Sequence, residues 1–199
     1  MNSIVGILLA AGASRRFGAD KLTQRLPNGE LVAVQACRNL LAGTDTVIAV
    51  VRPGNERLAI LLKAEGALII SCVDAELGMG KSLAFGIRSC FDASGWLIGL
   101  ADMPWIEPTT ISQVANALRS GAIIAAPSWQ GRRGHPVGFS KALGHELTLL
   151  TGDEGAKALL QTYHVQLQII PCDDYGILRD IDKLEDLHPS KKTKEHAWQ

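Results

Sequence analysis

Apolar residues recur along the chain in five short runs, each with the length and composition of a strand buried on both faces of a sheet. Helix-length segments separate most of the runs, and this alternation is typical of a doubly wound α/β fold. The runs are Ile4–Leu9, Thr46–Val51, Ala67–Cys72, Gly95–Leu100 and Ala122–Ala126. The pattern therefore predicts a three-layer arrangement around a mostly parallel sheet.

Two of the intervening segments carry helix signals at both ends. Pro53–Glu65 and Pro108–Arg119 each begin with proline, and each is followed closely by a glycine, Gly66 or Gly121. Proline in the first turn and glycine just past the last one are the residues favoured at helix termini. We therefore expect a helix over each segment.

The alternation weakens beyond residue 127 and predicts a small mixed part of the same domain. The elements expected there are a short strand over Pro136–Phe139, a helix over Asp153–Tyr163, a strand over Val165–Ile170 and an extended piece over Ile177–Ile181. With no linker-like run in the chain, we expect one domain over residues 1–188. Residues 189–199 are charged without apolar periodicity and are expected to form a frayed tail.

The amino-acid composition mainly excludes several classes of protein. Of the 199 residues, 47% are hydrophobic and 20% charged, with zero net charge, which favours neither disorder nor nucleic-acid binding. The first apolar run does not resemble a signal peptide, because Arg15 and Arg16 follow it where the cleavage site would lie. No other apolar run approaches the length of a membrane span, so we expect no membrane partner. The four cysteines are scattered without a C-x-x-C pair. Buried, reduced thiols in a cytoplasmic protein are expected.

The first apolar run leads straight into a loop of small residues, A-A-G-A-S at 10–14, which is followed by Arg15, Arg16 and Lys21. Because these residues have little side chain, an anion can approach the backbone N–H groups closely. The cations nearby can neutralise its charge. A tight turn with cations in solvent is the alternative. We favour a phosphate-binding loop at the carboxyl end of the strand.

Acidic residues suggest a metal site at the same edge of the sheet. Asp102 follows the apolar run W-L-I-G-L-A, and Pro104 prevents the strand from continuing. In open α/β sheets, ligands bind beyond the carboxyl ends of the strands, and Mg²⁺ is held there by one or two carboxylates plus substrate phosphates. Asp180 and Asp182 are candidates for the second carboxylate. Alternation along an extended segment would point only one of them towards the site.

The segment A-E-L-G-M-G-K-S at 75–82 offers a competing interpretation. It departs from the Walker A pattern only at Ala75, and Asp102 could then belong to a Walker B strand. However, a P-loop follows its strand directly, whereas Asp74 and Glu76 would place two carboxylates beside the phosphates. A P-loop kinase or ATPase is therefore kept as a distant alternative, and a plain helix start with Lys81 in solvent is another.

Six motifs in fixed order resemble those of the MobA/MocA-like nucleotidyltransferases. They are L-A-A-G-A-S-R-R-F-G-A-D-K (9–21), G-M-G-K-S-L (78–83), L-A-D-M-P (100–104), R-G-H-P-V-G-F (133–139), T-G-D-E-G-A-K (151–157) and D-I-D-K-L-E-D-L (180–187). The resemblance spans residues 4 to about 187 and implies a Rossmann-like fold of the nucleotide-diphospho-sugar transferase type. Within this group, L-A-A-G and R-G-H-P-V are more similar to the MocA-type cytidylyltransferases than to the MobA-type guanylyltransferases.

The resemblance also implies roles for individual residues. Arg15, Lys21 and Asp102 would act in catalysis, and Asp102 and Asp182 would hold Mg²⁺. The second substrate would lie at His135 and Pro136, although a structural loop histidine is the alternative for His135. Apart from the resemblance, the charge of Arg132 and Arg133 suits an anionic second substrate, and the alternative is that both face solvent. The nucleotide would be held by Leu9, Ala10, Ala11, Gly12, Ser14, Arg15, Lys21, Gly80 and Ser82.

Three positions depart from the family pattern. Lys183 and Leu184 stand where the family has Thr-Pro after its second aspartate, which weakens the case for Asp182 as a metal ligand. Phe17 replaces the usual methionine, and Lys81 is an additional cation near the nucleotide segment.

The implied reaction is transfer of CMP from CTP to the terminal phosphate of molybdopterin or the molybdenum cofactor, with release of pyrophosphate. This nucleophile is ionised near neutral pH, so the reaction needs no strong general base. A guanylyltransferase, a nucleotidyltransferase with another phosphorylated acceptor, and a non-catalytic nucleotide-binding protein are the alternatives. A recipient molybdoenzyme is a further expected partner.

Overall fold

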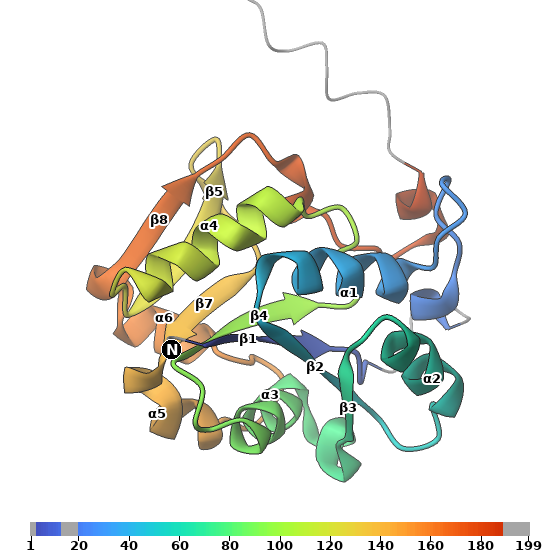
Figure 1. The fold of residues 1–199 in the computed structure, drawn as a ribbon, viewed down its shortest axis with the longest axis horizontal. Helices are drawn as coiled ribbons and strands as arrows, with labels where there is room; N and C mark the ends of the chain where they lie inside the picture. The colour runs from blue at the N-terminus through green and yellow to red at the C-terminus, as the bar shows by residue number, and fades with distance from the viewer. Residues whose placement is uncertain (1–2, 13–19, 189–199) are drawn as a thin grey trace, which may run out of the picture.

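The computed structural model describes residues 3–12 and 20–188, and its centre is a single mixed sheet (Figure 1). The strand order is β3-β2-β1-β4-β7-β5-β6, and β8 also pairs with β5. The strands are β1 (Ile4–Leu9), β2 (Thr46–Val51), β3 (Leu68–Ser71), β4 (Gly95–Leu100), β5 (Ile124–Trp129), β6 (Arg132–Arg133), β7 (Val137–Ser140) and β8 (Leu167–Pro171). The strands β3, β2, β1 and β4 run parallel. The predicted mostly parallel α/β fold is confirmed.

The part of the chain beyond residue 127 completes this sheet. Strand β7 is antiparallel to both of its neighbours, β4 and β5, and thereby joins the two parallel groups. Strand β8 pairs in parallel with β5. The mixed part predicted from the weaker periodicity is therefore the region where the sheet changes strand direction.

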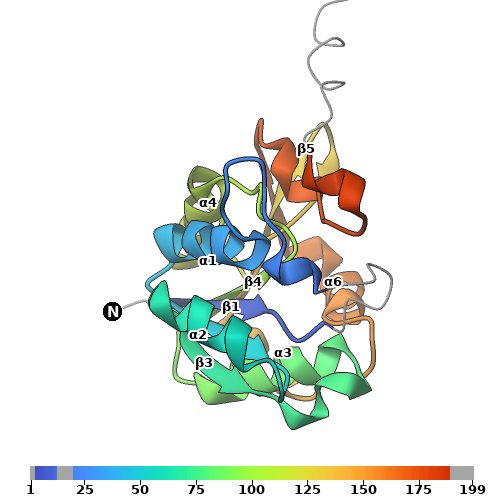
Figure 2. The ribbon, with the colours of Figure 1, turned by 90° about the vertical axis from the view of Figure 1, so that its right-hand side faces the viewer.

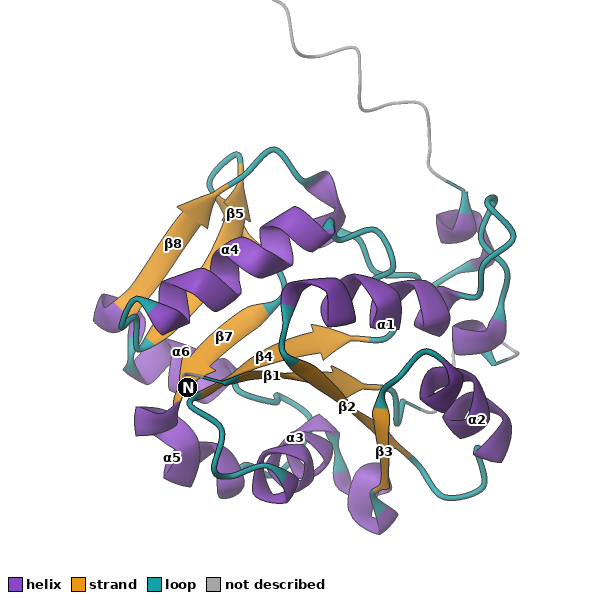
Figure 3. Cartoon of the chain, in the orientation of Figure 1, coloured by secondary structure: helices purple, strands orange, loops and turns teal. Residues whose placement is uncertain are grey.

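Helices cover both faces of the sheet (Figures 1 and 3). They are α1 (Val32–Gly43), α2 (Glu56–Ala64), α3 (Met79–Ser89), α4 (Pro108–Arg119), α5 (Gly144–Thr148) and α6 (Lys157–Thr162). Short 3₁₀ helices cover Lys21–Thr23, Val73–Leu77, Lys141–Leu143, His164–Gln166, Tyr175–Leu178 and Leu184–Leu187. Helices α1 and α4 lie on one face, and α3 and α5 lie on the other.

Alternate residues of β1 pack into the two layers because successive side chains of a strand point to opposite faces. Ile4 and Leu8 join the apolar cluster beneath α1 and α4, whereas Val5 and Ile7 join the cluster above α3 and α5. Gly6 lies where α1 approaches most closely, since a Cβ there would come within 2.8 Å of the Leu40 side chain. This close contact holds α1 against the centre of the sheet.

The element boundaries differ from the sequence prediction where a glycine or a tertiary contact intervenes. Helix α2 begins at Glu56 rather than Pro53, because Gly54 adopts a φ of +82°. The predicted 153–163 helix is reduced to α6, with Gly155 at a φ of +55°. The extended piece expected over Ile177–Ile181 is wrong at its start, since residues 175–178 form a 3₁₀ turn that Asp174 caps.

Some sequence predictions fall on residues outside the described ranges. These are Ser14 and Arg15 in the opening loop, together with the tail predicted over residues 189–199. Within residues 3–12 and 20–188, no helix combines the length and apolar character needed to cross a lipid bilayer.

Candidate functional site

A cavity of about 420 Å³ opens at the edge of the sheet where β1, β2 and β4 end. Figure 2 views the molecule from the side towards which β1 and β4 run. Residues from the first loop, the start of α3 and the end of β4 line the cavity together. The lining residues are Leu9, Ala11, Gly12, Arg52, Ala75, Glu76, Gly78, Met79, Ser82, Leu100, Asp102 and Asp153. We call this space the strand-end cavity.

Backbone pairing holds the first residues of the opening loop at the mouth of the sheet. The N–H of Ala10 donates to the carbonyl of Val50 at 2.9 Å, and the N–H of Ala101 donates to the carbonyl of Leu9 at 3.1 Å. Ala10 is buried and Gly12 is exposed, and within residues 3–12 and 20–188 no atom lies within 4 Å of a Cβ built on Gly12. The loop therefore emerges from the sheet with open space beside Gly12, which suits the approach of a large anion.

Lys21 lies between two carboxylates, and one of them, Asp102, lines the strand-end cavity. Its Nζ donates to Oδ2 of Asp102 at 2.7 Å and to Oδ1 of Asp182 at 3.3 Å. The Lys21 side chain is only 14% exposed. Burial lowers its pKa, but the hydrogen bonds and charges of Asp102 and Asp182 outweigh burial and raise the pKa above its ordinary value. Lys21 is therefore a fixed positive charge at neutral pH.

The segment around residue 181 is attached directly to the loop that carries Asp102. The N–H of Ile181 donates to the backbone carbonyl of Asp102 at 2.9 Å, and the Ile181 side chain is fully buried. Asp182 thereby faces Lys21. Burial raises the pKa of Asp180, with further contributions from the charges of Asp182 and Asp102. Both aspartates of the segment thus lie near Asp102, although the ion pair with Lys21 is made by Asp182.

The donor set at Lys21 suits a hard divalent cation that also binds phosphate oxygens. Two carboxylates, Asp102 and Asp182, converge on one positive charge and present oxygen atoms, the ligands that Mg²⁺ and Mn²⁺ prefer. Across the described part of the chain, no three His, Cys, Asp or Glu side chains gather as a metal-binding group. The set therefore fits an ion that completes its shell with substrate and water, and it does not fit a closed zinc site.

Asn39, on α1, secures the loop that follows Asp102. Its Nδ2 donates to the carbonyls of Pro104 and Ile106, both at 2.9 Å. We expect Asn39→Ala to lower the free energy of unfolding by about 1–3 kcal/mol, because two backbone acceptors lose their donor. Urea denaturation tests this. In the control Asn116→Ala, which removes the contact of an exposed asparagine with half-buried Arg119, the change should stay within about 0.5 kcal/mol. Equal losses in the two variants would contradict the role of Asn39.

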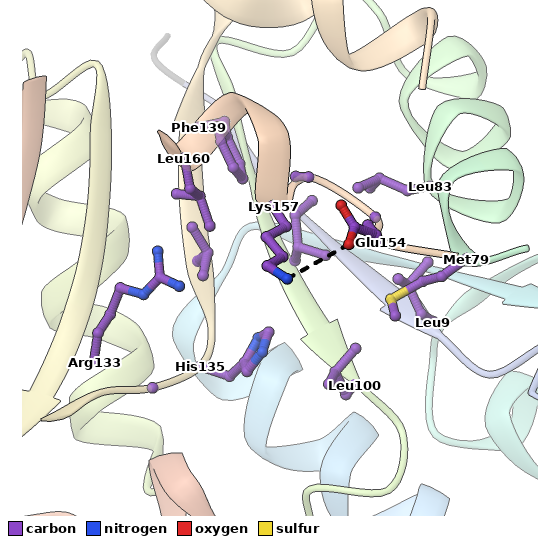
Figure 4. Close-up of a pocket in the computed structure, with 15 residues that line it drawn as sticks. Leu9, Met79, Leu83, Leu100, Arg133, His135, Phe139, Glu154, Lys157 and Leu160 are labelled. Carbon is purple, nitrogen blue, oxygen red and sulfur yellow. Dashed lines mark hydrogen bonds and ion pairs between the residues drawn. The ribbon is translucent and has the colours of Figure 1, made fainter. Parts of the chain in front are cut away.

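A second cavity, of about 240 Å³, adjoins the first and shares Leu9, Met79 and Leu100 with it (Figure 4). Arg133 and His135, both predicted to contact the second substrate, line it. The remaining lining residues are Leu83, Ile98, Gly134, Val137, Phe139, Glu154, Gly155, Ala156, Lys157 and Leu160. We call this space the side cavity. Pro136 instead lines a separate small void beside Leu40 and Met103.

The imidazole of His135 stands in the side cavity as a neutral group. Burial lowers its pKa and outweighs the opposite effects of the Ile98 backbone and the Asp102 charge. Among the described residues, its Nδ1 is a buried atom without a hydrogen-bond partner. The backbone N–H of His135 donates to the carbonyl of Ile177 at 3.0 Å, which anchors the loop. The ring therefore adds no fixed positive charge to the side cavity.

Because the pKa of His135 is lowered in the folded protein, the free energy of unfolding should decrease as the pH falls. The unfolded chain takes up a proton near the ordinary histidine pKa of about 6.5, whereas the folded protein resists it. Wild-type protein should therefore lose free energy of unfolding relative to His135→Gln as the pH falls below about 6.5. Urea denaturation of both proteins at pH 7.5 and pH 5 measures the difference. An unchanged difference between the two pH values would contradict this expectation.

The G-M-G-K-S segment packs against other parts of the protein. A P-loop would need the backbone N–H groups of this segment to be free for phosphate. The N–H of Gly80 donates to the carbonyl of Gly152 at 2.8 Å, and Gly78 packs against residues 152 and 153. A 3₁₀ helix, Val73–Leu77, also separates the segment from β3. Ser82 is buried and lines the strand-end cavity, whereas Gly80 lies against the backbone of Thr151. The arrangement does not support the Walker A interpretation.

The structure adds charged residues that the sequence analysis did not assign to the site. Arg52 lies directly after β2, and Glu76 and Asp153 line the same strand-end cavity. Glu154 and Lys157 line the side cavity. Arg52 could have been found from its place at the end of a predicted strand. Glu154 and Lys157 stand in a motif that was recognised, but nothing local indicated that it folds back onto α3.

The fold and this site define an α/β protein with a ligand-binding edge at the carboxyl ends of parallel strands. Residues 6–168 match the MobA-like NTP transferase domain. The chain therefore belongs to the MobA-like NTP transferase family, which confirms the resemblance that the motifs indicated and makes it a member of a nucleotidyltransferase family.

Relatives and solved structures resemble nearly the whole chain. The purine catabolism protein PucB of Bacillus subtilis (strain 168) is 31% identical over 195 residues, covering 92% of this chain and 93% of PucB. Nicotine blue oxidoreductase of Paenarthrobacter nicotinovorans is 27% identical over 194 residues, covering 93% and 95%. The structure of Rv0371c of Mycobacterium tuberculosis H37Rv in complex with manganese has a TM-score of 0.75 at 21% identity, covering 92% and 95%.

Proposed function

We propose that this protein transfers CMP from CTP to the terminal phosphate of molybdopterin or the molybdenum cofactor and releases pyrophosphate. The observation that carries the proposal is the pair of adjoining cavities, which meet at Leu9, Met79 and Leu100. A transfer reaction needs two substrates whose reacting atoms are brought together. In this proposal the nucleotide occupies the strand-end cavity and the acceptor occupies the side cavity.

The proposed nucleotide contacts rest on the family resemblance, and the strand-end cavity beside the opening loop supports them. In this proposal Leu9, Ala10, Ala11 and Gly12 provide the backbone of the nucleotide site. Leu9, Ala11 and Gly12 border the cavity, whereas the N–H of Ala10 is bonded to Val50 and supports the loop. Ser82 borders the same space, and Gly80 supports the start of α3. Ser14 and Arg15 belong to the proposed phosphate-binding set on the sequence evidence alone. With Arg15 on the departing pyrophosphate, the loop would hold the triphosphate at the sheet edge.

Lys21 is proposed to stabilise the negative charge that develops at the α-phosphate. Its ammonium is already oriented by Asp102 and Asp182, so little reorganisation is needed when the nucleotide binds. Asp102 and Asp182 would also hold Mg²⁺, and a divalent ion there would neutralise phosphate charge. The solved relative crystallised with manganese supports a divalent cation. The acceptor phosphate is ionised near neutral pH, so none of these residues needs to act as a strong base.

The test is pyrophosphate release with CTP, GTP or ATP, each with Mg²⁺ and molybdopterin. We expect release with CTP and formation of the cytidine dinucleotide of the pterin. Release with GTP alone would instead favour the guanylyltransferase alternative, and no release with any nucleotide would reject this substrate pair. Because one relative is named an oxidoreductase, oxidation of NADH and NADPH in the same mixtures should be followed as a separate readout.

A further inference from the structure

The segment T-G-D-E-G-A-K at 151–157 connects the two cavities. Its Gly152 carbonyl accepts the N–H of Gly80, which ties it to the start of α3. Asp153 lines the strand-end cavity, whereas Glu154 and Lys157 line the side cavity. None of its residues was assigned above to a nucleotide contact, yet Asp153 borders the strand-end cavity and two charged groups, Glu154 and Lys157, border the neighbouring space.

The wall of the side cavity is mostly apolar. Nine aliphatic, aromatic or thioether side chains form it: Leu9, Met79, Leu83, Ile98, Leu100, Val137, Phe139, Ala156 and Leu160. Such a lining excludes water well and stabilises a ring system or another apolar group. The body of a ligand that fills this space is therefore apolar or aromatic.

Charged side chains of both signs reach the same cavity from different elements (Figure 4). Arg133 comes from β6, and Lys157 comes from the first turn of α6. Lys157 contacts Glu154 at 3.5 Å, and these two side chains are 60% and 70% exposed. An ion pair this exposed contributes little to stability. An incoming anion can therefore replace Glu154 as the partner of Lys157 at small cost.

We propose that the side cavity binds a molecule that joins an apolar ring system to an anionic group, and that Lys157 and Arg133 recognise the anion. This inference rests on the proposed function only in identifying that molecule as the acceptor. Two cations, Arg133 and Lys157, and one carboxylate, Glu154, line this cavity, and their net positive charge favours phosphate, carboxylate or sulfonate over a neutral group. Lys157 is thus a specificity-determining residue outside the nucleotide site.

A fluorescent probe tests this proposal without nucleotide or turnover, so its result is independent of CMP transfer. The probe is 8-anilinonaphthalene-1-sulfonate, and N-phenyl-1-naphthylamine has the same rings without the anion. We expect Lys157→Gln to weaken binding of the sulfonate about two- to fivefold, the value of one solvent-exposed charge pair, and to leave the neutral probe unchanged. Glu154→Gln should tighten binding of the sulfonate, because the competing carboxylate is lost.

Two controls locate the probe and exclude general charge effects. Ala156→Phe fills the side cavity and should abolish binding of both probes, while circular dichroism and the urea midpoint show that the variant folds. Lys63→Gln, on the distant helix α2, should leave both affinities unchanged. The proposal is overturned if Ala156→Phe folds but binds both probes normally, or if Lys157→Gln weakens both probes equally. Equal weakening by Lys63→Gln and Lys157→Gln would also overturn it.

Discussion

Replacing Lys21 by alanine is expected to slow pyrophosphate release about 100- to 1,000-fold, which corresponds to a barrier about 2.7–4 kcal/mol higher. The reason is geometric, because Nζ is held 2.7 Å from Oδ2 of Asp102 and 3.3 Å from Oδ1 of Asp182 before any substrate arrives. Removing it takes away a preorganised cation and leaves two carboxylates to repel the nucleotide phosphates. Steady-state turnover with saturating CTP and acceptor measures the effect.

Lys81→Ala is the matched control for Lys21→Ala. Lys81 is a half-buried lysine in the first turn of α3, in the segment that resembles a P-loop, so the control removes the same side chain from the competing site. We expect it to retain turnover. Far-ultraviolet circular dichroism and the urea midpoint should show that both variants fold. Full activity in Lys21→Ala together with lost activity in Lys81→Ala would reverse the assignment and favour the P-loop alternative.

Gly78→Ala is expected to lower the free energy of unfolding by about 2–5 kcal/mol, the sum of a backbone penalty and an overpacking penalty. Gly78 has a φ of +114°, a region that L residues rarely adopt. A Cβ there would also lie 2.3 Å from the carbonyl oxygen of Gly152 and 2.7 Å from Oδ1 of Asp153. The 151–155 segment must therefore move, and both cavities should change shape with it.

Gly121→Ala separates the two penalties. Its φ of +102° is similar, but no atom of the described residues lies within 4 Å of the position that its Cβ would take. It should therefore show only the backbone penalty, about 1–2 kcal/mol. Urea denaturation of both variants gives the comparison, and the Michaelis constants for nucleotide and acceptor should rise in Gly78→Ala alone. Equal stability losses would mean that the packing of residues 151–155 on Gly78 contributes nothing.

The elements best predicted from the sequence are those whose signals are local. Strands β1, β2 and β4 and helix α4 have the bounds that the apolar runs and the Pro108 signal predicted. A strand buried on both faces must be apolar throughout, so its length can be read directly from the chain. The start of α2 was predicted three residues early, because the conformation of Gly54 is not encoded in periodicity.

The position of β7 could not have been predicted in this way. It lies between β4 and β5 and runs against both, although β5 precedes it in the chain. Its short apolar run predicts a strand but contains no information about its neighbours, since partners in a sheet are chosen by long-range packing. This position matters for the site, because it brings Arg133 and His135 beside the end of β4.

For the candidate site, the sequence by itself determined which residue types stand at the strand ends: small residues after β1, a carboxylate after β4, and cations close behind. That much follows from local composition, because a backbone phosphate site needs small residues and a metal needs carboxylate oxygens. Only the tertiary structure decided that Lys21 lies between Asp102 and Asp182, and that residues 151–157 fold onto α3 beside a second cavity. Contacts between residues about 80 or 160 positions apart depend on how the whole chain folds, and no local sequence pattern predicts them.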